Sequence, residues 1–323
     1  MDFDSIHIQR LKRYLNKIKR LYGDYAYKTI LYALKQRYSK RPFKLTGKEA
    51  EAITQEFQDG LLKTINTATA SAWVLANQKC NYVFRKGYAK PIHANSETLK
   101  TFQGRKIGDL TLSERVWNLT QDHKRQIEWA IDVALEEGKS AQQLSREVRQ
   151  YLNNPDKLFR RVRDKYGNLV LSKNAEAFHP GQGVYRSSFK NAMRLASNEI
   201  NFAYRDSEQL RFKQNPDVVA TKIYLSPSHK IYDMCDDLQG IYPKNFEWNG
   251  WHLGCKCFRK AILRTDKEFK QDLPPEQSEN YVSEPPKNFD KWVRENQDRI
   301  ATTKTKMKWM SNRVIKEKNY KKR

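Results

Sequence analysis

The stretch WHLGCKC, residues 251–257, places His252, Cys255 and Cys257 within six positions of one another. A further cysteine, Cys235, lies upstream and completes the pattern C-x16-H-x2-C-x-C. Soft thiolates and an imidazole are the ligands that zinc prefers, and a structural zinc site is closed by four protein ligands. The spacing therefore predicts a structural zinc site made of Cys235, His252, Cys255 and Cys257, with two additional candidate ligands, His229 and Asp233.

Two other interpretations of these cysteines stay open. Two of them would form a disulfide only outside a reducing cytoplasm, for example in a particle that leaves the cell. Alternatively, all of them are buried thiols around a tryptophan-rich loop. The fourth cysteine of the chain, Cys80, stands alone in a helical pattern, and we expect it to be a small buried apolar residue.

A catalytic zinc is the third alternative, and it predicts a zinc-dependent nuclease or another phosphoester hydrolase. Such an enzyme would use His229 or His252 together with Asp233 or Asp236. The sequence contains neither an H-E-x-x-H pattern nor a Walker loop, and it lacks the deaminase pattern H-x-E with P-C-x-x-C. Four protein ligands would also leave zinc without an open position. We therefore expect a structural site, no catalytic residues and no enzymatic activity.

The charge of the chain points to a polyanionic partner. Its 323 residues include 61 Lys and Arg against 37 Asp and Glu, which gives a net charge of +24. Such an excess favours nucleic acid or an anionic surface, although it does not specify a fold. No apolar run approaches the ~20 residues that span a bilayer, and the first residues lack the apolar segment of a secretory signal. We expect synthesis in the cytoplasm and no membrane span.

The first ~85 residues have a helical pattern. Ile8, Leu11, Leu15, Ile18 and Tyr22 recur at steps of three and four, which places them on one helix face. The opposite face is strongly basic, as is the C-terminal stretch 304–323, which has nine Lys or Arg and one Glu. These two segments supply the candidate nucleic-acid-binding residues: Lys12, Arg13, Lys17, Lys19, Arg20, Lys316, Lys318, Lys321, Lys322 and Arg323.

The middle of the chain combines helices with one hairpin. A second helix is predicted over about 47–83, then a connector to about 109, then a helix that Ser113 caps. Ser140 and Gln143 form a capping-box pattern before another helical run. Residues 159–172 read as a β-hairpin that turns at Tyr166-Gly167-Asn168. A glycine loop at 179–188 then enters a helix that carries a polar stripe: Arg186, Lys190, Arg194, Asn198, Asn201 and Arg205. Such a stripe is typical of a solvated face or of a face packed on a charged neighbour.

After residue 215 the pattern changes to short strands and loops. A strand is predicted at 218–226, a Pro-rich linker at 273–287 and a short helix at 288–300. We expect a mainly α protein with a small α+β module. The predicted regions are a helical basic N-terminal region (1–108), a helical core with the β-hairpin (109–212), a compact α+β Cys/His module (213–264), and a linker, short helix and basic tail (265–323).

Several of these pieces, in this order, resemble the phage Mu F-like minor head proteins, also called the head-morphogenesis family. The helix RLASNEINFAYR (194–205) is similar to a helical motif of the family, and the set Asp233, Cys235, Leu238 and Gly240 follows it. His252, Cys255, Lys256 and Cys257 then resemble the family's His-Pro-x-Cys-Arg-Cys ending. The segments 159–196 and 285–300 are similar to the subgroup from prophages of Bacteroides-type bacteria. This chain departs from the family pattern at Asn198, Leu253 and Lys256, none of which is a proposed ligand.

The resemblance implies a minor capsid component in few copies, at the portal vertex or in the capsid interior of the virion, assembled in the bacterial cytoplasm. Its implied role lies in head assembly and in DNA packaging or delivery. Its implied partners are the portal protein, other head proteins and packaged double-stranded DNA, which it would bind without sequence preference. A nucleic-acid-binding protein unrelated to capsids would share the charge, but it would not explain the order of the motifs.

Overall fold

The computed structural model describes residues 1–35, 43–136, 143, 146, 161–171, 187–303 and 305–312. Within these residues the protein is mainly helical, with one small antiparallel sheet and a two-stranded hairpin, which confirms the predicted fold class. Two compact units are built from interleaved segments. The sheet unit comprises Met1–Gln9, Thr69–Phe102 and Asn198–Arg323, and the bundle unit comprises Arg10–Ala68 and Gln103–Ser197.

This division differs from the four consecutive regions that the sequence pattern indicates. Three long helices each contribute residues to both units: α1 (Phe3–Lys35), α2 (Lys48–Val83) and α7 (Ser188–Gln214). A helix is continuous along its hydrogen-bond ladder, so composition shifts along the chain do not reveal where its packing partners change.

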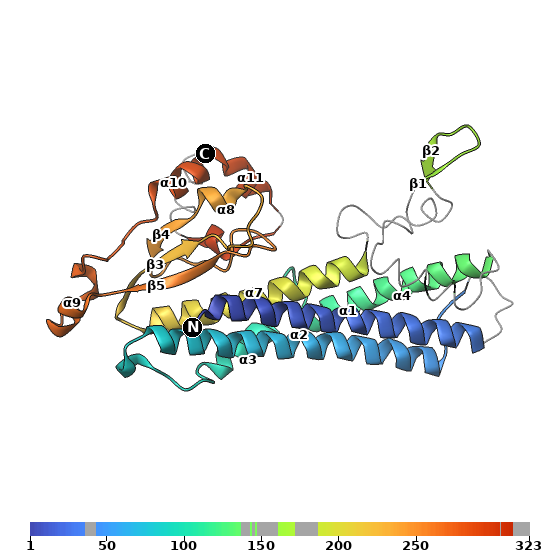
Figure 1. Ribbon diagram of the computed structural model, residues 1–323, viewed down its shortest axis with the longest axis horizontal. Helices are drawn as coiled ribbons and strands as arrows, with labels where there is room; N and C mark the ends of the chain where they lie inside the picture. The colour runs from blue at the N-terminus through green and yellow to red at the C-terminus, as the bar shows by residue number, and fades with distance from the viewer. Residues whose placement is uncertain are drawn as a thin grey trace. The chain divides into compact units, whose positions relative to one another are not determined.

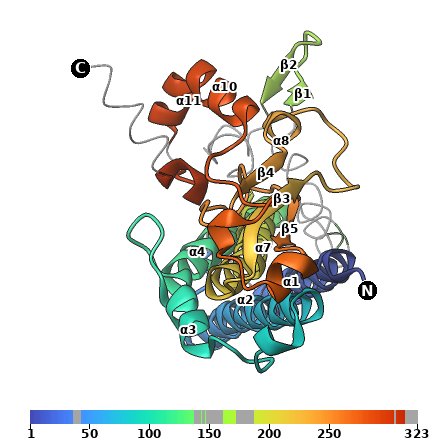
Figure 2. The ribbon, with the colours of Figure 1, turned by 90° about the vertical axis from the view of Figure 1, so that its left-hand side faces the viewer.

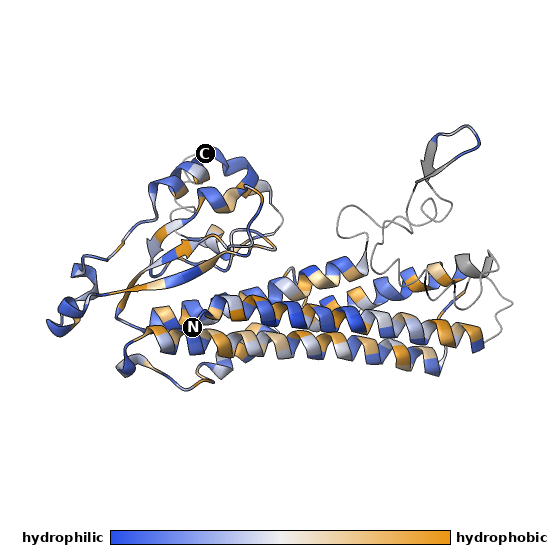
Figure 3. Ribbon diagram, in the orientation of Figure 1, coloured by the Kyte–Doolittle hydropathy of each residue, from blue (hydrophilic) through white to orange (hydrophobic). Residues whose placement is uncertain are grey.

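Four helices form the core of the bundle unit: α1, α2, α7 and α4 (Leu112–Glu136). Hydrophilic and hydrophobic residues alternate along each long helix in Figure 3, as amphipathic helices require. The predicted apolar face of α1 is confirmed, since Ile18 and Tyr22 are fully buried and Leu15 packs against the same core. In α4, Ile127, Ala130 and Ile131 are buried as expected.

The beginning of α4 corrects one prediction. Thr111, and not Ser113, precedes the helix: the Thr111 backbone amide donates to Glu114 at 2.7 Å, and the Thr111 hydroxyl accepts from the Glu114 amide at 3.3 Å. This reciprocal pair is a capping box. The predicted connector before it contains a nine-residue helix, α3 (Ser96–Gly104), and a 3-10 turn, η1 (Lys86–Tyr88), which its Gly and Pro content had concealed.

The hairpin is confirmed. Strand β1 (Arg161–Arg163) pairs antiparallel with β2 (Leu169–Leu171), as drawn in Figure 1. Gly167 takes a φ of +83° in the turn, and the Asp164 carboxylate accepts from the amides of Tyr166 and Asn168. Ser140, most of the helical run after it, residues 179–186 of the glycine loop and residues 313–323 lie outside the described residues.

A three-stranded antiparallel sheet organises the sheet unit. Strand β3 (Val218–Tyr224), predicted from the sequence, lies between β4 (Gly240–Pro243) and β5 (Phe258–Leu263), as Figure 2 shows. Thr221, Ile223 and Arg259 are buried on one face of this sheet. The loop between β3 and β4 contains one helical turn, α8 (Met234–Asp237).

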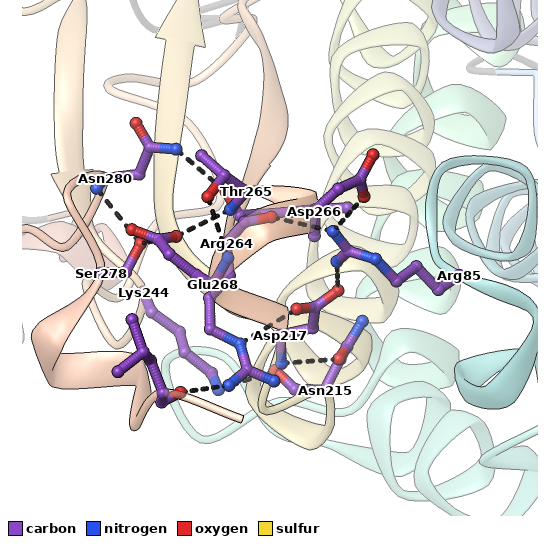
Figure 4. Close-up of polar contacts among 12 residues, drawn as sticks. Arg85, Asn215, Asp217, Lys244, Arg264, Thr265, Asp266, Glu268, Ser278 and Asn280 are labelled. Carbon is purple, nitrogen blue, oxygen red and sulfur yellow. Dashed lines mark hydrogen bonds and ion pairs between the residues drawn. The ribbon is translucent and has the colours of Figure 1, made fainter. Parts of the chain in front are cut away.

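A buried carboxylate fixes the end of α2 to the start of β3. The side chain of Asp217 has no exposed surface and pairs with Arg85 and Arg264, and Arg85 also pairs with Asp266 in α9 (Asp266–Lys270), as Figure 4 shows. Since a buried charge is stable only with well-placed partners, these two arginines are required for the local structure.

The predicted linker is tied to its neighbours. Glu268 in α9 accepts from the Ser278 hydroxyl at 2.9 Å and from the Glu279 amide at 2.7 Å (Figure 4 shows the Ser278 bond). The hydrogen bond from the Glu279 backbone amide is the largest cause of the low pKa of Glu268, which is about 2. A 3-10 turn, η4 (Pro275–Gln277), lies in the same segment. Residues 273–280 are therefore held against α9 by these hydrogen bonds.

Residues 288–300 form two short helices, α10 (Lys287–Glu295) and α11 (Gln297–Thr302), where one was expected. A 3-10 helix, η5 (Lys308–Ser311), follows and carries Trp309, which is fully buried among Trp251, Phe289 and Trp292. This part of the basic stretch is thus core and not a solvated tail. In the described parts of the chain, we find no helix with the length and apolar character of a bilayer span.

Candidate metal centre

The single turn of α8 presents Cys235. Asp233 precedes the turn and accepts a hydrogen bond from the Cys235 amide at 2.7 Å, while Asp236 accepts from the Asp233 amide at 2.8 Å. This capping box fixes the start of a helix too short to be stable alone. Asp236 also contacts His229 Nε2 at 2.8 Å. The hydrogen bond from the Asp233 backbone amide lowers the pKa of Asp236 most, and the hydrogen bond with His229 lowers it further. This carboxylate is therefore charged at neutral pH.

The second ligand-bearing segment is a tight turn. The Cys255 amide donates to the His252 carbonyl at 3.2 Å, and Gly254 takes a φ of +78° at the third position. A positive φ there is typical of a type II turn and favours glycine. Gly250, at φ +128°, is required for another reason: a Cβ at this position would lie 2.6 Å from Arg205 Nη1.

These two segments converge. The Sγ atoms of Cys235 and Cys255 are 3.8 Å apart, and His252 Nε2 is 3.2 Å from Cys235 Sγ. The ligand atoms of Cys235, Cys255 and Cys257 all lie within 4.8 Å of one another, and we call these three residues the cysteine cluster. With Zn–S bonds of about 2.3 Å, a tetrahedral site places two sulfurs about 3.8 Å apart. The cysteine cluster thus fits a metal with thiolate ligands.

The tautomer of His252 also suits a metal ligand. Its Nδ1 lies 2.8 Å from the Leu253 carbonyl, which can only accept, so Nδ1 carries the hydrogen. In the neutral ring, Nε2 then presents a lone pair toward Cys235 Sγ and toward Asp233 Oδ2, which is 3.3 Å away. The Nε2 lone pair and the Asp233 carboxylate repel each other unless a proton or a cation lies between them. A metal ion resolves this repulsion.

Without a bound metal, the pKa values of the three thiols shift in different directions. Burial alone would raise the pKa of Cys255, but hydrogen bonds from Cys235 and Cys257 and the charge of Arg205 place it well below the usual value. Hydrogen bonding to Cys255 raises the pKa of Cys235. For Cys257, the bond with Cys235 lowers the pKa, but the bond with Cys255 and burial outweigh it. One thiolate is thus stabilised by two thiol donors.

The predicted ligands are brought together in two overlapping groups. The cysteine cluster is one, and Asp233, Cys235 and His252 form the other, within the same 4.8 Å limit. His229 belongs to neither, because it groups with Asp233 and Asp236. All four cysteines are free, and Cys80 is buried away from the cluster, where burial raises its pKa to about 12. A fourth ligand would be His252 or Asp233.

Sequence reasoning missed the support that α7 gives to this loop. Arg205 is buried and donates to the carbonyls of Asn249, Cys255 and Cys257 at 2.7–2.8 Å. Asn198 accepts from the Gly254 amide at 2.8 Å. The C-terminal part of the predicted polar stripe is therefore buried and structural. The seven-residue separation of Asn198 and Arg205, which puts both on one helix face, was the available signal.

The candidate nucleic-acid residues of α1 are all exposed: Lys12, Arg13, Lys17, Lys19 and Arg20. They lie on the bundle unit and form its basic face. The other five, Lys316, Lys318, Lys321, Lys322 and Arg323, are outside the described residues.

Comparison of the chain with protein-family models, with curated proteins and with solved structures found no match.

Proposed function

We propose that this protein is a non-enzymatic head-morphogenesis protein of the phage Mu F-like type, whose Cys/His module is stabilised by one structural zinc ion. The observation that carries the proposal is the convergence of Cys235 with the 252–257 turn, because the family resemblance rests on the same residues. A minor capsid protein of this kind would act at the portal vertex, in head assembly and in DNA packaging or delivery.

Burial of the cluster supports a structural role for zinc. Cys235, Cys255 and Cys257 are at most 3% exposed, and the loop that bears two of them is held by Arg205 through three carbonyls. A catalytic zinc needs an open position that substrate can reach. With His252 as the fourth ligand, three buried thiolates would fill a tetrahedral shell, and such a shell contributes directly to folding.

The basic face of α1 supports an association with DNA. Five exposed cations lie within nine residues of one helix, and the whole chain carries a charge of +24. Cations of this kind bind phosphates regardless of sequence and release counterions as they do so. This behaviour suits a protein that is packed beside a genome, whose sequence it does not read.

The portal association is tested by co-expression. The full-length chain would be expressed together with a portal protein from the same phage or prophage genome, and the chain would be captured through an affinity tag. We expect the portal protein to be retained at moderate salt. The Cys255→Ser variant, captured in the same way, shows whether retention requires an intact Cys/His module. The capsid proposal fails if the soluble portal protein is never retained and if particles assembled in the presence of this chain do not contain the chain.

A zinc-dependent nuclease is the second candidate, and one observation favours it. His229, Asp233 and Asp236 group within 4.8 Å beside the thiolates, which is a ligand set for a second cation or a general base. The test is cleavage of labelled single- and double-stranded DNA with zinc, magnesium or manganese. Cleavage that a chelator stops and that Asp236→Asn abolishes would establish an enzyme, whereas intact DNA under all conditions supports the structural role.

A further inference from the structure

The outer face of the three-stranded sheet carries an aromatic and basic cluster. The bulge beside Val219 sets the register so that Lys222 and Tyr224 of β3 point to the face opposite the buried Thr221 and Ile223. Antiparallel pairing places Phe258 directly opposite Tyr224, and Lys260 directly opposite Lys222. We call Lys222, Tyr224, Phe258 and Lys260 the sheet-face cluster.

The two rings of this cluster lie nearly parallel and stack against each other, so a further planar group can extend the stack. Their centroids are 5.4 Å apart and their planes differ by 12°. Both rings are only partly buried, Lys260 is exposed, and Ile241, which is paired with Lys222 on β4, is 39% exposed. Burial of aromatic rings is favourable, and these two rings stay partly accessible. A planar ligand that covers them would therefore gain binding free energy.

The charges of the cluster favour an anion. Lys222 Nζ lies 5.0 Å from the centre of the Tyr224 ring, and Lys260 Nζ lies 5.5 Å from the same point. Like charges directly opposite on a sheet are destabilising. Among the described residues, no carboxylate lies within ion-pair distance of either ammonium. The charge of Lys260 is the weakest of the causes that lower the pKa of Asp2. A bound phosphate would relieve this repulsion.

We infer that the sheet-face cluster binds single-stranded nucleic acid, with unpaired bases stacked on Tyr224 and Phe258 and the flanking phosphates held by Lys222 and Lys260. Stacking on aromatic residues together with lysines that follow the backbone is how sheets bind single strands without reading sequence. In a duplex the base faces are covered by their neighbours, so the rings add nothing to duplex binding. This inference concerns the sheet unit alone and does not depend on the capsid role or on the basic face of α1.

The test compares two labelled oligonucleotides of equal length and charge, one of thymidines and one of abasic sites, by fluorescence anisotropy with the full-length protein. We expect the thymidine strand to bind at least about tenfold more tightly, because each stacked base contributes measurably. The double variant Tyr224→Leu/Phe258→Leu should lose that preference and leave binding of the abasic strand nearly unchanged. A matched control is Tyr166→Leu, since Tyr166 is 75% exposed with Lys165 Nζ at 4.9 Å, but it lies on the bundle-unit hairpin.

Photo-crosslinking keeps the inference testable if the double variant does not fold. A bromodeoxyuridine strand bound to the unmodified protein should crosslink to Tyr224 or Phe258, and unlabelled single strand should compete better than duplex of equal charge. The inference is wrong if thymidine and abasic strands bind the unmodified protein equally, or if crosslinks appear only on the α1 cations. Equal competition by duplex DNA, heparin or anionic vesicles would likewise show electrostatic attraction alone.

Discussion

The sulfur atoms of Cys235 and Cys255 lie 3.8 Å apart, although the two residues are separated by 20 positions in the sequence. One is presented by a single helical turn and the other by a glycine-dependent turn before β5. Neither segment is long enough to be stable alone. Arg205 and Asn198 hold the turn, and a metal ion bound by the thiolates would join it to α8. The cysteine cluster could hold a metal ion, and we propose that this ion is zinc.

Replacing Cys255 with Ser tests whether the cluster stabilises the sheet unit. We expect the change to remove bound zinc and to lower the melting temperature by roughly 10 °C, because a structural metal contributes directly to folding. Calorimetry and zinc analysis of the same sample give both results. Cys80→Ser is the matched control: it also places a hydroxyl at a buried cysteine position, but it should leave zinc content unchanged. Zinc retained by Cys255→Ser would exclude this residue as a ligand.

Arg205 should act on the metal through the loop that it holds. In Arg205→Lys, one ammonium cannot reach the three carbonyls that the guanidinium fork reaches. We expect the zinc dissociation constant, measured by competition with a chelating dye, to rise about tenfold. Arg211→Lys is the control, since Arg211 is equally buried in α7 but donates to Asn77 and Asn81. Equal losses in both variants would mean a general packing effect.

His123 should make the bundle unit sensitive to acid. Its ring is 1% exposed, and burial lowers its pKa from 6.5 to about 3. Because the unfolded chain takes up this proton first as pH falls, the free energy of unfolding should decrease from about pH 6.5 toward about pH 3, by about 1.4 kcal/mol per unit. The contribution is fully present above pH 6.5.

Denaturant unfolding at several pH values checks this, with the difference between wild type and His123→Phe as the readout. The variant should lose the part of the slope that the histidine causes, while His93→Phe, at an exposed histidine, should keep it. Identical slopes for wild type and His123→Phe would show that His123 is not responsible.

The basic face of α1 should set the salt dependence of duplex binding. Changing Lys12, Arg13, Lys17, Lys19 and Arg20 to Gln should weaken binding and lower the slope of log K against log salt, by about 0.9 for each phosphate contact removed. Anisotropy titrations of a duplex at four salt concentrations measure both. A control removes the same charge from exposed lysines elsewhere: Lys63, Lys100, Lys267, Lys270 and Lys291. An equal effect in the control would mean that net charge alone acts.

The sequence was informative wherever a repeating pattern reports a local preference. The apolar stripe of α1, the hairpin at Gly167 and the strand at 218–224 follow from periodicity and turn chemistry, and all three are present. The spacing of Cys235, His252, Cys255 and Cys257 likewise predicted that thiols and imidazole would meet, since few other arrangements make use of such a set.

What the sequence did not reveal depends on tertiary contacts. Arg205 and Trp309 belong to segments that look solvated, yet each is buried because a distant partner satisfies it: carbonyls of the cysteine loop for Arg205, and the Trp251 carbonyl at 2.8 Å for Trp309 Nε1. Polar side chains that are buried with complete hydrogen bonding have the same sequence pattern as exposed ones. The interleaving of the two units was hidden for a similar reason, because helices continue unchanged across it.

Elemental analysis of the full-length protein, purified under reducing conditions without added metal, tests the central claim most directly. The account predicts one zinc per chain, held through dialysis and released together with a drop in melting temperature when a strong chelator is added. Protein that contains no metal, keeps its full thermal stability and does not respond to chelator would contradict it.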